Sequence, residues 1–273
     1  MQLSKHHGLG NDFLVLLDPS GKVALSADVV ARLCDRRRGI GADGVLRATR
    51  PASGAPSSAD AVMDLHNADG SRAEMSGNGI RCLAQALVRR GWVTTPAVVI
   101  STDAGLRTVE LQSAVDATTD VLAADMGPAH IGAEAPEWTG GELRRAAWAD
   151  MGNPHLVVAV DGPGALAGAD LVTLGEKVNA EVRAGANVHL MAAGPEGDVI
   201  TMRPFERGVG PTEACGTGAC AAAAVARGWG LVGKQVTVHM PGGSAEIHIG
   251  PTVRLVGPAT FVAMIDTEPD EWH

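Results

Sequence analysis

The chain has 273 residues, 45% of them apolar and 19% charged, and a net charge of −9. This composition is that of a globular protein with real cores, and the acidic balance, without a basic run or an aromatic stacking cluster, argues against nucleic-acid binding. The most apolar stretch, residues 219–226, is far too short to cross a bilayer, and residues 1–10 are too polar for a secretion signal.

In the first half, residues 51–59 are rich in Pro, Ser and Gly and predict a surface loop. A helix is predicted next, because apolar side chains recur at helical spacing between Ile80 and Val88 and Gly91 can end the helix. Residues 98–111 then read as a pair of strands that turns near Gly105.

The second half shows the same kinds of element. Residues 198–203 predict a strand, and residues 219–226 predict a helix that is apolar on every side and therefore buried. Residues 235–240 and 244–249 predict two more strands. Helices alternate poorly with strands, which disfavours a parallel Rossmann sheet. We expect an α+β fold in which a sheet wraps around one central helix in each half.

Motifs of the first half return in the second half in the same order. Gly-Asn-Asp-Phe-Leu-Val at 10–15 is echoed by Gly-Asn-Pro-His-Leu-Val at 152–157, and Arg-Gly-Trp follows both predicted helices, at 90–92 and 227–229. An ordered series of this kind indicates duplication. We expect two pseudo-symmetric domains, residues 1–120 and 121–261, with a terminal strand, 262–273, that returns to the first domain.

The most informative repeat is Ser-Gly-Asn-Gly at 76–79 and Cys-Gly-Thr-Gly at 215–218. In each copy a nucleophile-type residue, Ser76 or Cys215, precedes a Gly-x-Gly turn that opens a helix. Backbone N–H groups and the positive end of the helix dipole meet at such a place. Two such sites facing each other would grip a carboxylate and place an acid/base group on each side of one carbon.

Each of these residues also has a purely structural interpretation. Serine before a helix is usually an N-cap, and cysteine at a helix start is often a small buried residue. The four cysteines, at 34, 82, 215 and 220, lack the spacing of a zinc ribbon or a redox pair. We expect free thiols in a reducing cytoplasm and no metal site.

The ordered motifs resemble those of the diaminopimelate epimerase family over nearly the whole chain. They lie at residues 7–13, 39–43, 67–71, 75–82, 151–155 and 206–220. The resemblance implies an enzyme without cofactor that interconverts LL- and meso-diaminopimelate in lysine and cell-wall biosynthesis. It also implies two domains, each a sheet or barrel around a central helix, that close over the substrate, and a cytoplasmic homodimer.

The proposed chemistry explains the residue types. Inversion at an α-carbon needs a base on one face and an acid on the other, and a thiol pKa of ~8.5 can be lowered at a helix N-terminus. We therefore expect Cys215 to be thiolate-prone and to be alkylated before the other cysteines. The backbone N–H groups expected to hold the substrate carboxylate belong to Gly77, Asn78, Gly216 and Thr217.

The resemblance also implies which side chains bind the rest of the substrate. The asparagines and the arginine can hydrogen-bond its distal amino-acid end, and the glutamate can accept from an ammonium group. No pyridoxal phosphate is expected, because none of the four lysines lies in a sequence like a Schiff-base site. The family's substrate positions fall on Asn11, Asn67, Asn153, Asn187, Glu206 and Arg207.

Ser76 departs from the family pattern, which carries a second catalytic cysteine at this position. A hydroxyl is far less acidic than a thiol and needs a neighbour to act as a base. His155 and His66 are candidate helpers, whereas Cys82 lies six residues further along the helix and should face the wrong way. Gly44 is a milder departure, at a place where some relatives carry a polar side chain.

Two alternatives to diaminopimelate epimerisation stay open. One is a racemase, isomerase or dehydratase of the same fold that acts on another amino acid with a single thiol base. The other is a non-catalytic amino-acid binder, such as a Cys-to-Ser variant that traps its substrate. The retained polar substrate positions favour the epimerase over the first alternative, and the retained Cys215 disfavours the binder.

Overall fold

The computed structural model describes residues 1–52, 58–195 and 197–268. Residues 53–57 of the expected loop lie outside these ranges. The chain divides into two compact units, Met1–Ala124 with the segment that begins at Pro258, and Asp125–Gly257. These boundaries differ by a few residues from those expected. The reason is that β8 (Thr119–Asp125) pairs with β7 (Gly105–Ala114) of unit 1, and residues 260–266 of β17 (Val253–Asp266) pair with β1 (Gln2–Gly8).

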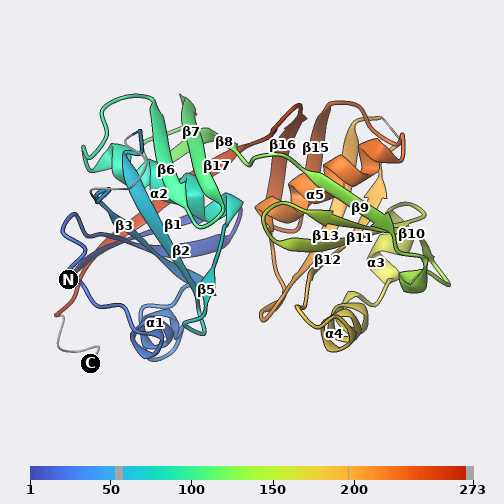
Figure 1. The fold of residues 1–273 in the computed structure, drawn as a ribbon, viewed down its shortest axis with the longest axis horizontal. Helices are drawn as coiled ribbons and strands as arrows, with labels where there is room; N and C mark the ends of the chain where they lie inside the picture. The colour runs from blue at the N-terminus through green and yellow to red at the C-terminus, as the bar shows by residue number, and fades with distance from the viewer. Residues whose placement is uncertain (53–57, 196, 269–273) are drawn as a thin grey trace. The chain divides into compact units, whose positions relative to one another are not determined.

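In unit 1 the strand pairings of the described residues close into a ring, which leaves the ring without free edges (Figure 1). Helix α2 (Gly77–Arg89) packs against β1, β2 (Asn11–Leu17), β3 (Gly44–Thr49) and β7, and its first eleven residues are buried. A short strand, β5 (Arg72–Ala73), pairs with β4. The ring runs β1 (Gln2–Gly8), β2 (Asn11–Leu17), β3 (Gly44–Thr49), β4 (Ala61–Asn67), β6 (Ala97–Thr102), β7 (Gly105–Ala114), β8 and the end of β17.

Unit 2 repeats this arrangement around α5 (Gly216–Gly228), whose residues 216–226 are all buried. Two backbone hydrogen bonds join Val253, at the start of the last strand, to residues 126 and 127, which precede β9 (His130–Glu134), the first strand of this unit. A short strand, β14 (Gly210–Pro211), pairs with β13. The order is β9 (His130–Glu134), β10 (Leu143–Asp150), β11 (Pro154–Val160), β12 (Asn187–Ala193), β13 (Val199–Glu206), β15 (Gln235–Met240), β16 (Gly243–Ile249) and the start of β17.

The directions of the strands match as well as their order. In unit 1, β2 and β3 are parallel, β3 and β4 antiparallel, β4 and β6 parallel, and β6 and β7 antiparallel. In unit 2, β11, β12, β13, β15 and β16 follow the same sequence of directions. The predicted α+β fold, with a central helix in each of two similar halves, is therefore confirmed.

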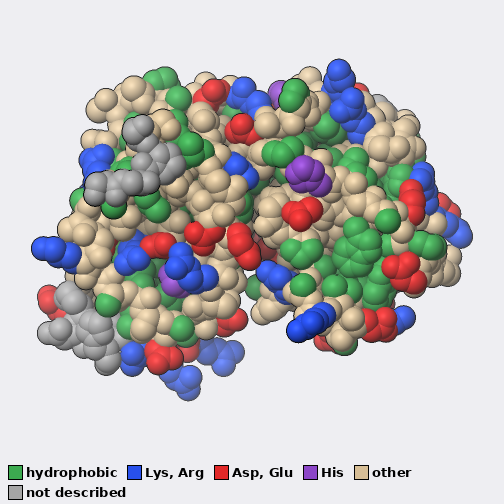
Figure 2. Space-filling view, in the orientation of Figure 1, with side chains coloured by type: hydrophobic (Ala, Val, Ile, Leu, Met, Phe, Trp, Pro, Cys, Tyr) green, Lys and Arg blue, Asp and Glu red, His purple; other side chains and the backbone are tan. Residues whose placement is uncertain are grey.

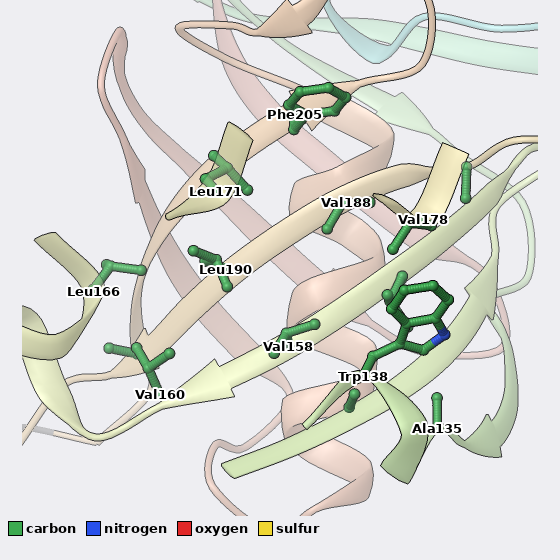
Figure 3. Packing of buried hydrophobic residues seen from close by; sticks show 14 residues of the cluster. Ala135, Trp138, Val158, Val160, Leu166, Leu171, Val178, Val188, Leu190 and Phe205 are labelled. Atoms are coloured by element: carbon green, nitrogen blue, oxygen red, sulfur yellow. The ribbon is translucent and has the colours of Figure 1, made fainter. Parts of the chain in front are cut away.

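The outer face of the unit 2 sheet is covered by the short helices α3 (Gly162–Gly168) and α4 (Leu171–Glu181) and the 3₁₀ helix η1 (Pro136–Trp138). Figure 3 shows Val188 and Leu190 of β12 in this outer cluster, with Leu190 near Leu166 and Leu171 and Val188 near Val178. Side chains alternate across a strand. His189 therefore lies on the opposite face of β12, toward α5. In unit 1 the corresponding outer helix is α1 (Ala27–Cys34), which is capped by Ser26.

The described surface carries both signs of charge. Figure 2 shows basic and acidic side chains interspersed over the visible face. None of the helices in the described residues is long and apolar enough to cross a membrane.

Candidate active site

Ser76 is the N-cap of α2 in unit 1. Its backbone is extended, with φ −139° and ψ 123°, and its Oγ accepts a hydrogen bond from the Gly79 N–H at 3.0 Å. The carbonyl of Ser76 accepts the first helical bond from Ile80 at 2.9 Å. The side chain is half-buried. The hydroxyl therefore lies at the positive end of a buried helix, where it can donate its own proton.

Asn78 and Asn11 come together beside this helix start. The Asn78 Nδ2 donates to Asn11 Oδ1 at 3.3 Å, and the Arg81 Nη2 donates to Asn78 Oδ1 at 2.7 Å. Arg81 is fully buried and also donates to the Gly77 carbonyl at 2.8 Å. A buried guanidinium thus orients Asn78 and adds positive charge where a carboxylate is expected to bind.

Asn11 is held from its other side by Asp43. Its Nδ2 donates to Asp43 Oδ2 at 2.9 Å. Arg36 bridges the carboxylates of Asp43 and Asp12 at 2.7 and 2.6 Å, and Lys5 contacts Asp12 at 2.9 Å. Burial works to raise the pKa of Asp12, but the hydrogen bonds and charges of Arg36 and Lys5 outweigh it and leave the pKa lowered. This ionic cluster fixes the start of β2, and with it Asn11.

Asn67 ends β4 and uses its side chain locally. Its Nδ2 donates to Ser71 Oγ at 3.0 Å, and its backbone closes the turn that contains Gly70. Gly44 lies opposite Asn67 on β3, and a Cβ on Gly44 would lie 2.6 Å from the His66 carbonyl oxygen. The close approach of these strands explains the glycine at position 44. His66 is buried near the Gly70 carbonyl, at 3.4 Å.

Cys215 caps α5 in unit 2 as Ser76 caps α2. Its φ and ψ are −126° and 108°, and its Sγ accepts from the Gly218 N–H at 3.4 Å. The thiol also lies 3.6 Å from Thr217 Oγ1. Only 3% of the residue is exposed. The repeated sequence motif therefore forms the same local structure twice, with sulfur in one unit and oxygen in the other.

The pKa of the Cys215 thiol shifts in the direction opposite to the one expected, while the expected order of alkylation stays a prediction. Burial and the negative charge of Glu206 raise the pKa of the thiol well above its usual value, against hydrogen bonds from Thr217 and the Gly218 N–H that lower it. Burial likewise raises the pKa of Cys34 and Cys82 to about 12. Near neutral pH Cys215 is therefore a protonated thiol, which can act as an acid and must lose its proton before it can act as a base.

The predicted polar residues of unit 2 gather around β12 and β13. Asn187 is buried at the start of β12, and its Oδ1 accepts from the Arg207 N–H at 2.9 Å. Glu206 ends β13 and accepts from Thr212 Oγ1 at 2.7 Å. The Arg207 guanidinium is exposed and donates to the Ala184 carbonyl at 2.9 Å. Asn187, Glu206 and Arg207 therefore lie close to one another.

Asn153 belongs to the same unit, in the turn between β10 and β11. Its Oδ1 lies 2.8 Å from His155 Nε2, and His155 Nδ1 lies 2.9 Å from His189 Nε2. His155, named from the sequence as a helper for Ser76, is therefore already engaged by two side chains of its own unit.

The residues that hold the predicted ones were missed from the sequence. Asp43 and Arg81 fall within recognised motifs, but nothing in the pattern shows that they bind Asn11 and Asn78. His189 gave one signal, a lone imidazole within an otherwise apolar run at 188–193. In the described ranges, no group of three or more His, Cys, Asp or Glu side chains could hold a metal ion.

Comparison with known proteins gives the same family as the motifs. The protein-family model described as diaminopimelate epimerase matches residues 3–131 and 147–262. A diaminopimelate epimerase of Mycolicibacterium paratuberculosis is 40% identical, covering 100% of this chain and 99% of its own length. One from Thermobifida fusca is 40% identical, over 96% of both chains.

Solved structures share the fold at low identity. A probable proline racemase from Agrobacterium radiobacter has a TM-score of 0.73 and 19% identity, covering 98% of this chain and 92% of its own. A phenazine biosynthesis protein of the PhzF family from Bacillus anthracis has a TM-score of 0.75 and 15% identity, with coverages of 98% and 99%. The family model and the full-length relatives together show that this chain belongs to the diaminopimelate epimerase family.

Proposed function

We propose that the protein is a diaminopimelate epimerase, an isomerase that interconverts LL- and meso-diaminopimelate by moving the proton on one α-carbon. The full-length identity of about 40% to proteins named diaminopimelate epimerase carries this proposal. The structure supports it with two similar units, each of which has a proton-bearing side chain at the start of a buried helix. Lysine and cell-wall biosynthesis follow as its setting, in the cytoplasm and as a homodimer.

Cys215 and Ser76 are the proposed proton-transfer groups. Cys215 is a neutral thiol, so it can protonate the α-carbon once another base has taken the α-proton. It can take the α-proton itself only after its own proton has passed to a base, and Glu206 is the neighbouring carboxylate proposed to receive it. Ser76 is the weaker group, because its hydroxyl is far less acidic than a thiol and needs a neighbouring base to take its proton before it can act as one. The two groups are therefore unequal, and one direction of transfer should limit turnover.

Helix geometry supports the proposed binding of the reacting carboxylate. The first amide groups of a helix have no acceptor within the helix and point along the positive end of its dipole. In this chain these are the N–H groups of Gly77, Asn78, Gly216 and Thr217. Donors fixed in advance stabilise the negative charge that develops when the α-proton leaves.

The polar side chains of both units are proposed to bind the rest of the substrate. Asn11 and Asn187 are each held by a hydrogen bond from or to another residue, so they need little reordering to bind. Asn67, Asn153, Glu206 and Arg207 complete the proposed set. A substrate with two amino-acid ends would pair these groups, whereas a shorter amino acid would leave buried donors unpaired.

The test is an assay of purified protein with LL-diaminopimelate, in which the meso isomer is separated on a chiral column. Lysine, which lacks the second carboxylate, is assayed beside it. We expect turnover of diaminopimelate and much poorer turnover of lysine. Arg207→Met should raise KM for diaminopimelate, whereas Arg254→Met, on β17, should leave KM unchanged. Equal rates on lysine and diaminopimelate would instead favour a racemase of another amino acid.

A further inference from the structure

A chain of three hydrogen-bonding side chains lies in unit 2. Asn153 Oδ1 is 2.8 Å from His155 Nε2, and His155 Nδ1 is 2.9 Å from His189 Nε2. Both imidazoles are fully buried, with ring centroids 5.1 Å apart. His155 and His189 come from the parallel neighbours β11 and β12. Burying a polar side chain lowers the stability of the fold unless its hydrogen bonds are made, so the bonds within this chain matter.

The network fixes where each proton lies. Burial lowers the pKa of His189 to about 3 and that of His155 well below its usual value, so both rings are neutral and carry one N–H each. A carboxamide oxygen only accepts, so the N–H of His155 must be at Nε2. Its Nδ1 is then a bare acceptor, and the N–H of His189 must be at Nε2.

The one ring nitrogen still to be considered, His189 Nδ1, agrees with donation from His189 to His155. His189 Nδ1 is buried and has no hydrogen-bond partner among the described residues. With the N–H at Nε2, the unpartnered atom is a lone pair. The opposite direction would bury an unpartnered N–H at the same place, which is rarer in folded proteins than an unsatisfied acceptor. Donation therefore runs from His189 to His155 and on to Asn153.

This direction determines what Asn153 can offer. Its carbonyl oxygen is occupied by His155, so its NH₂ group is the end that points away from the histidines. An NH₂ group donates and cannot accept. The turn at 151–154 therefore presents a donor, which suits a carboxylate of the substrate rather than its ammonium group.

His189 also touches the turn that contains the catalytic thiol. A Cβ on Gly218 would lie 2.4 Å from His189 Cε1 and 2.5 Å from Nε2, so the imidazole packs directly on this glycine. Gly218 is the residue whose N–H donates to Cys215 Sγ. One ring thus supports both the Asn153 turn and the Cys215 cap.

We propose that His189 is a positioning residue: its Nε2–H fixes the tautomer of His155, so that Asn153 presents its NH₂ group to a substrate carboxylate, while its ring supports the Cys215 turn. This assignment rests on the proposed epimerase function. His189 itself touches neither the substrate nor the reacting carbon, and acts through His155 and Gly218.

The first measurement uses the unaltered protein labelled with ¹⁵N. Long-range ¹H–¹⁵N spectra of the imidazoles should give a protonated-type shift for Nε2 and a bare-type shift for Nδ1 in both His155 and His189. A proton on Nδ1 of His189 would overturn the proposal. This readout requires neither activity nor a variant that folds.

The second measurement compares two substitutions of similar size. His189→Met removes the donor, whereas His189→Gln keeps an N–H near the position of Nε2. Loss of a buried partner should raise KM for diaminopimelate about tenfold in His189→Met with a smaller change in kcat. His189→Gln should restore KM to within about threefold of the unaltered protein.

The outcomes separate this inference from the proposed function. An unaltered protein that does not epimerise diaminopimelate defeats the function, and the tautomer spectra then decide about His189 alone. An active protein whose KM is the same in all three forms contradicts the positioning role. Equal losses in His189→Met and His189→Gln also contradict it, because packing rather than the donated proton would then be the cause.

Discussion

At the scale of single residues, the two helix caps lie in environments that act differently on the acidity of the capping side chain. Both side chains accept an N–H from the third residue of their helix, at 3.0 Å for Ser76 and 3.4 Å for Cys215. This favours negative charge on either atom. At Cys215, burial and the charge of Glu206 act more strongly in the other direction. The position of a residue on a helix thus does not by itself determine its acidity.

Glu206→Gln tests this balance. Removal of the carboxylate charge should lower the pKa of Cys215, so alkylation by iodoacetamide should reach its half-maximal rate at a lower pH. The measurement is the pH profile of labelling at Cys215 by mass mapping. Glu246→Gln, which removes a carboxylate from β16 of the same unit, is the control and should leave the profile in place. A profile unchanged by Glu206→Gln would show that burial alone sets the thiol's acidity.

The local structure of the two helix caps could be predicted from the sequence, but the partners of the candidate site residues could not. A nucleophile before Gly-x-Gly predicts an N-cap, because the cap depends on neighbours within three positions. The raised pKa of Cys215 depends on Glu206, at the end of a strand, and on burial by distant residues. The support of Asn11 by Asp43 depends on β2 and β3 lying side by side. Such contacts join residues that are far apart in the sequence, so no local sequence pattern predicts them.

At the scale of elements, the first turn of each central helix packs differently in the two units. A Cβ on Gly79 of α2 would find its nearest atom, Ser76 Cβ, at 3.1 Å. A Cβ on Gly218 of α5 would lie 2.4 Å from the His189 ring, which buried strands hold in place. The two glycines occupy matching positions in the sequence but not in packing.

Gly218→Ala should therefore destabilise the protein, by about 1–3 kcal/mol from overpacking, while Gly79→Ala should cost much less. Alanine gains up to about 1 kcal/mol of helix propensity at either site, so it does not distinguish them. Urea unfolding of both variants beside the unaltered protein gives the comparison. Equal shifts in the two variants would mean that the imidazole moves aside at little cost.

Elements with strong local signals were predicted well. The helix expected around residues 80–88 is α2, and the strands expected at 235–240 and 244–249 are β15 and β16. The strand that holds His189 was not predicted. This strand is buried on both faces, so its sequence lacks the alternation of apolar and polar residues that identifies a half-buried strand.

At the scale of the whole molecule, buried neutral histidines link stability to pH. Burial lowers the pKa of His6 from 6.5 to about 4 and that of His189 to about 3. Between these values and 6.5 the unfolded chain binds more protons than the folded one. Stability is therefore full above pH 6.5 and falls as the pH drops toward the folded-state pKa.

His6→Gln isolates one of these contributions. From about pH 7.5 to about pH 5, the unaltered protein should lose on the order of 2 kcal/mol more stability than His6→Gln, because a buried imidazole must stay uncharged. Urea unfolding at the two pH values measures the difference. His130→Gln, at an exposed position on β9, is the control and should behave like the unaltered protein. An identical pH response in all three proteins would contradict the assignment of His6.

The duplicated architecture followed from the order of motifs in the sequence, since each motif marks the same turn in either unit. The closure of the strands into a ring in unit 1 could not be read from that order. It depends on β17, whose start pairs with β16 and whose end pairs with β1, more than 250 residues away along the chain.

The central claim is that Cys215 and Ser76 each transfer a proton to or from the same α-carbon, and deuterium labelling tests it most directly. LL-diaminopimelate incubated with the protein in deuterium oxide should give the meso isomer with one solvent deuterium at the inverted carbon. Ser76→Cys should epimerise faster and Ser76→Ala more slowly, within the ~10²–10⁴-fold range of a positioned acid or base. Deuterium that enters LL-diaminopimelate without inversion, or a Ser76→Ala variant as fast as the unaltered protein, would contradict the account.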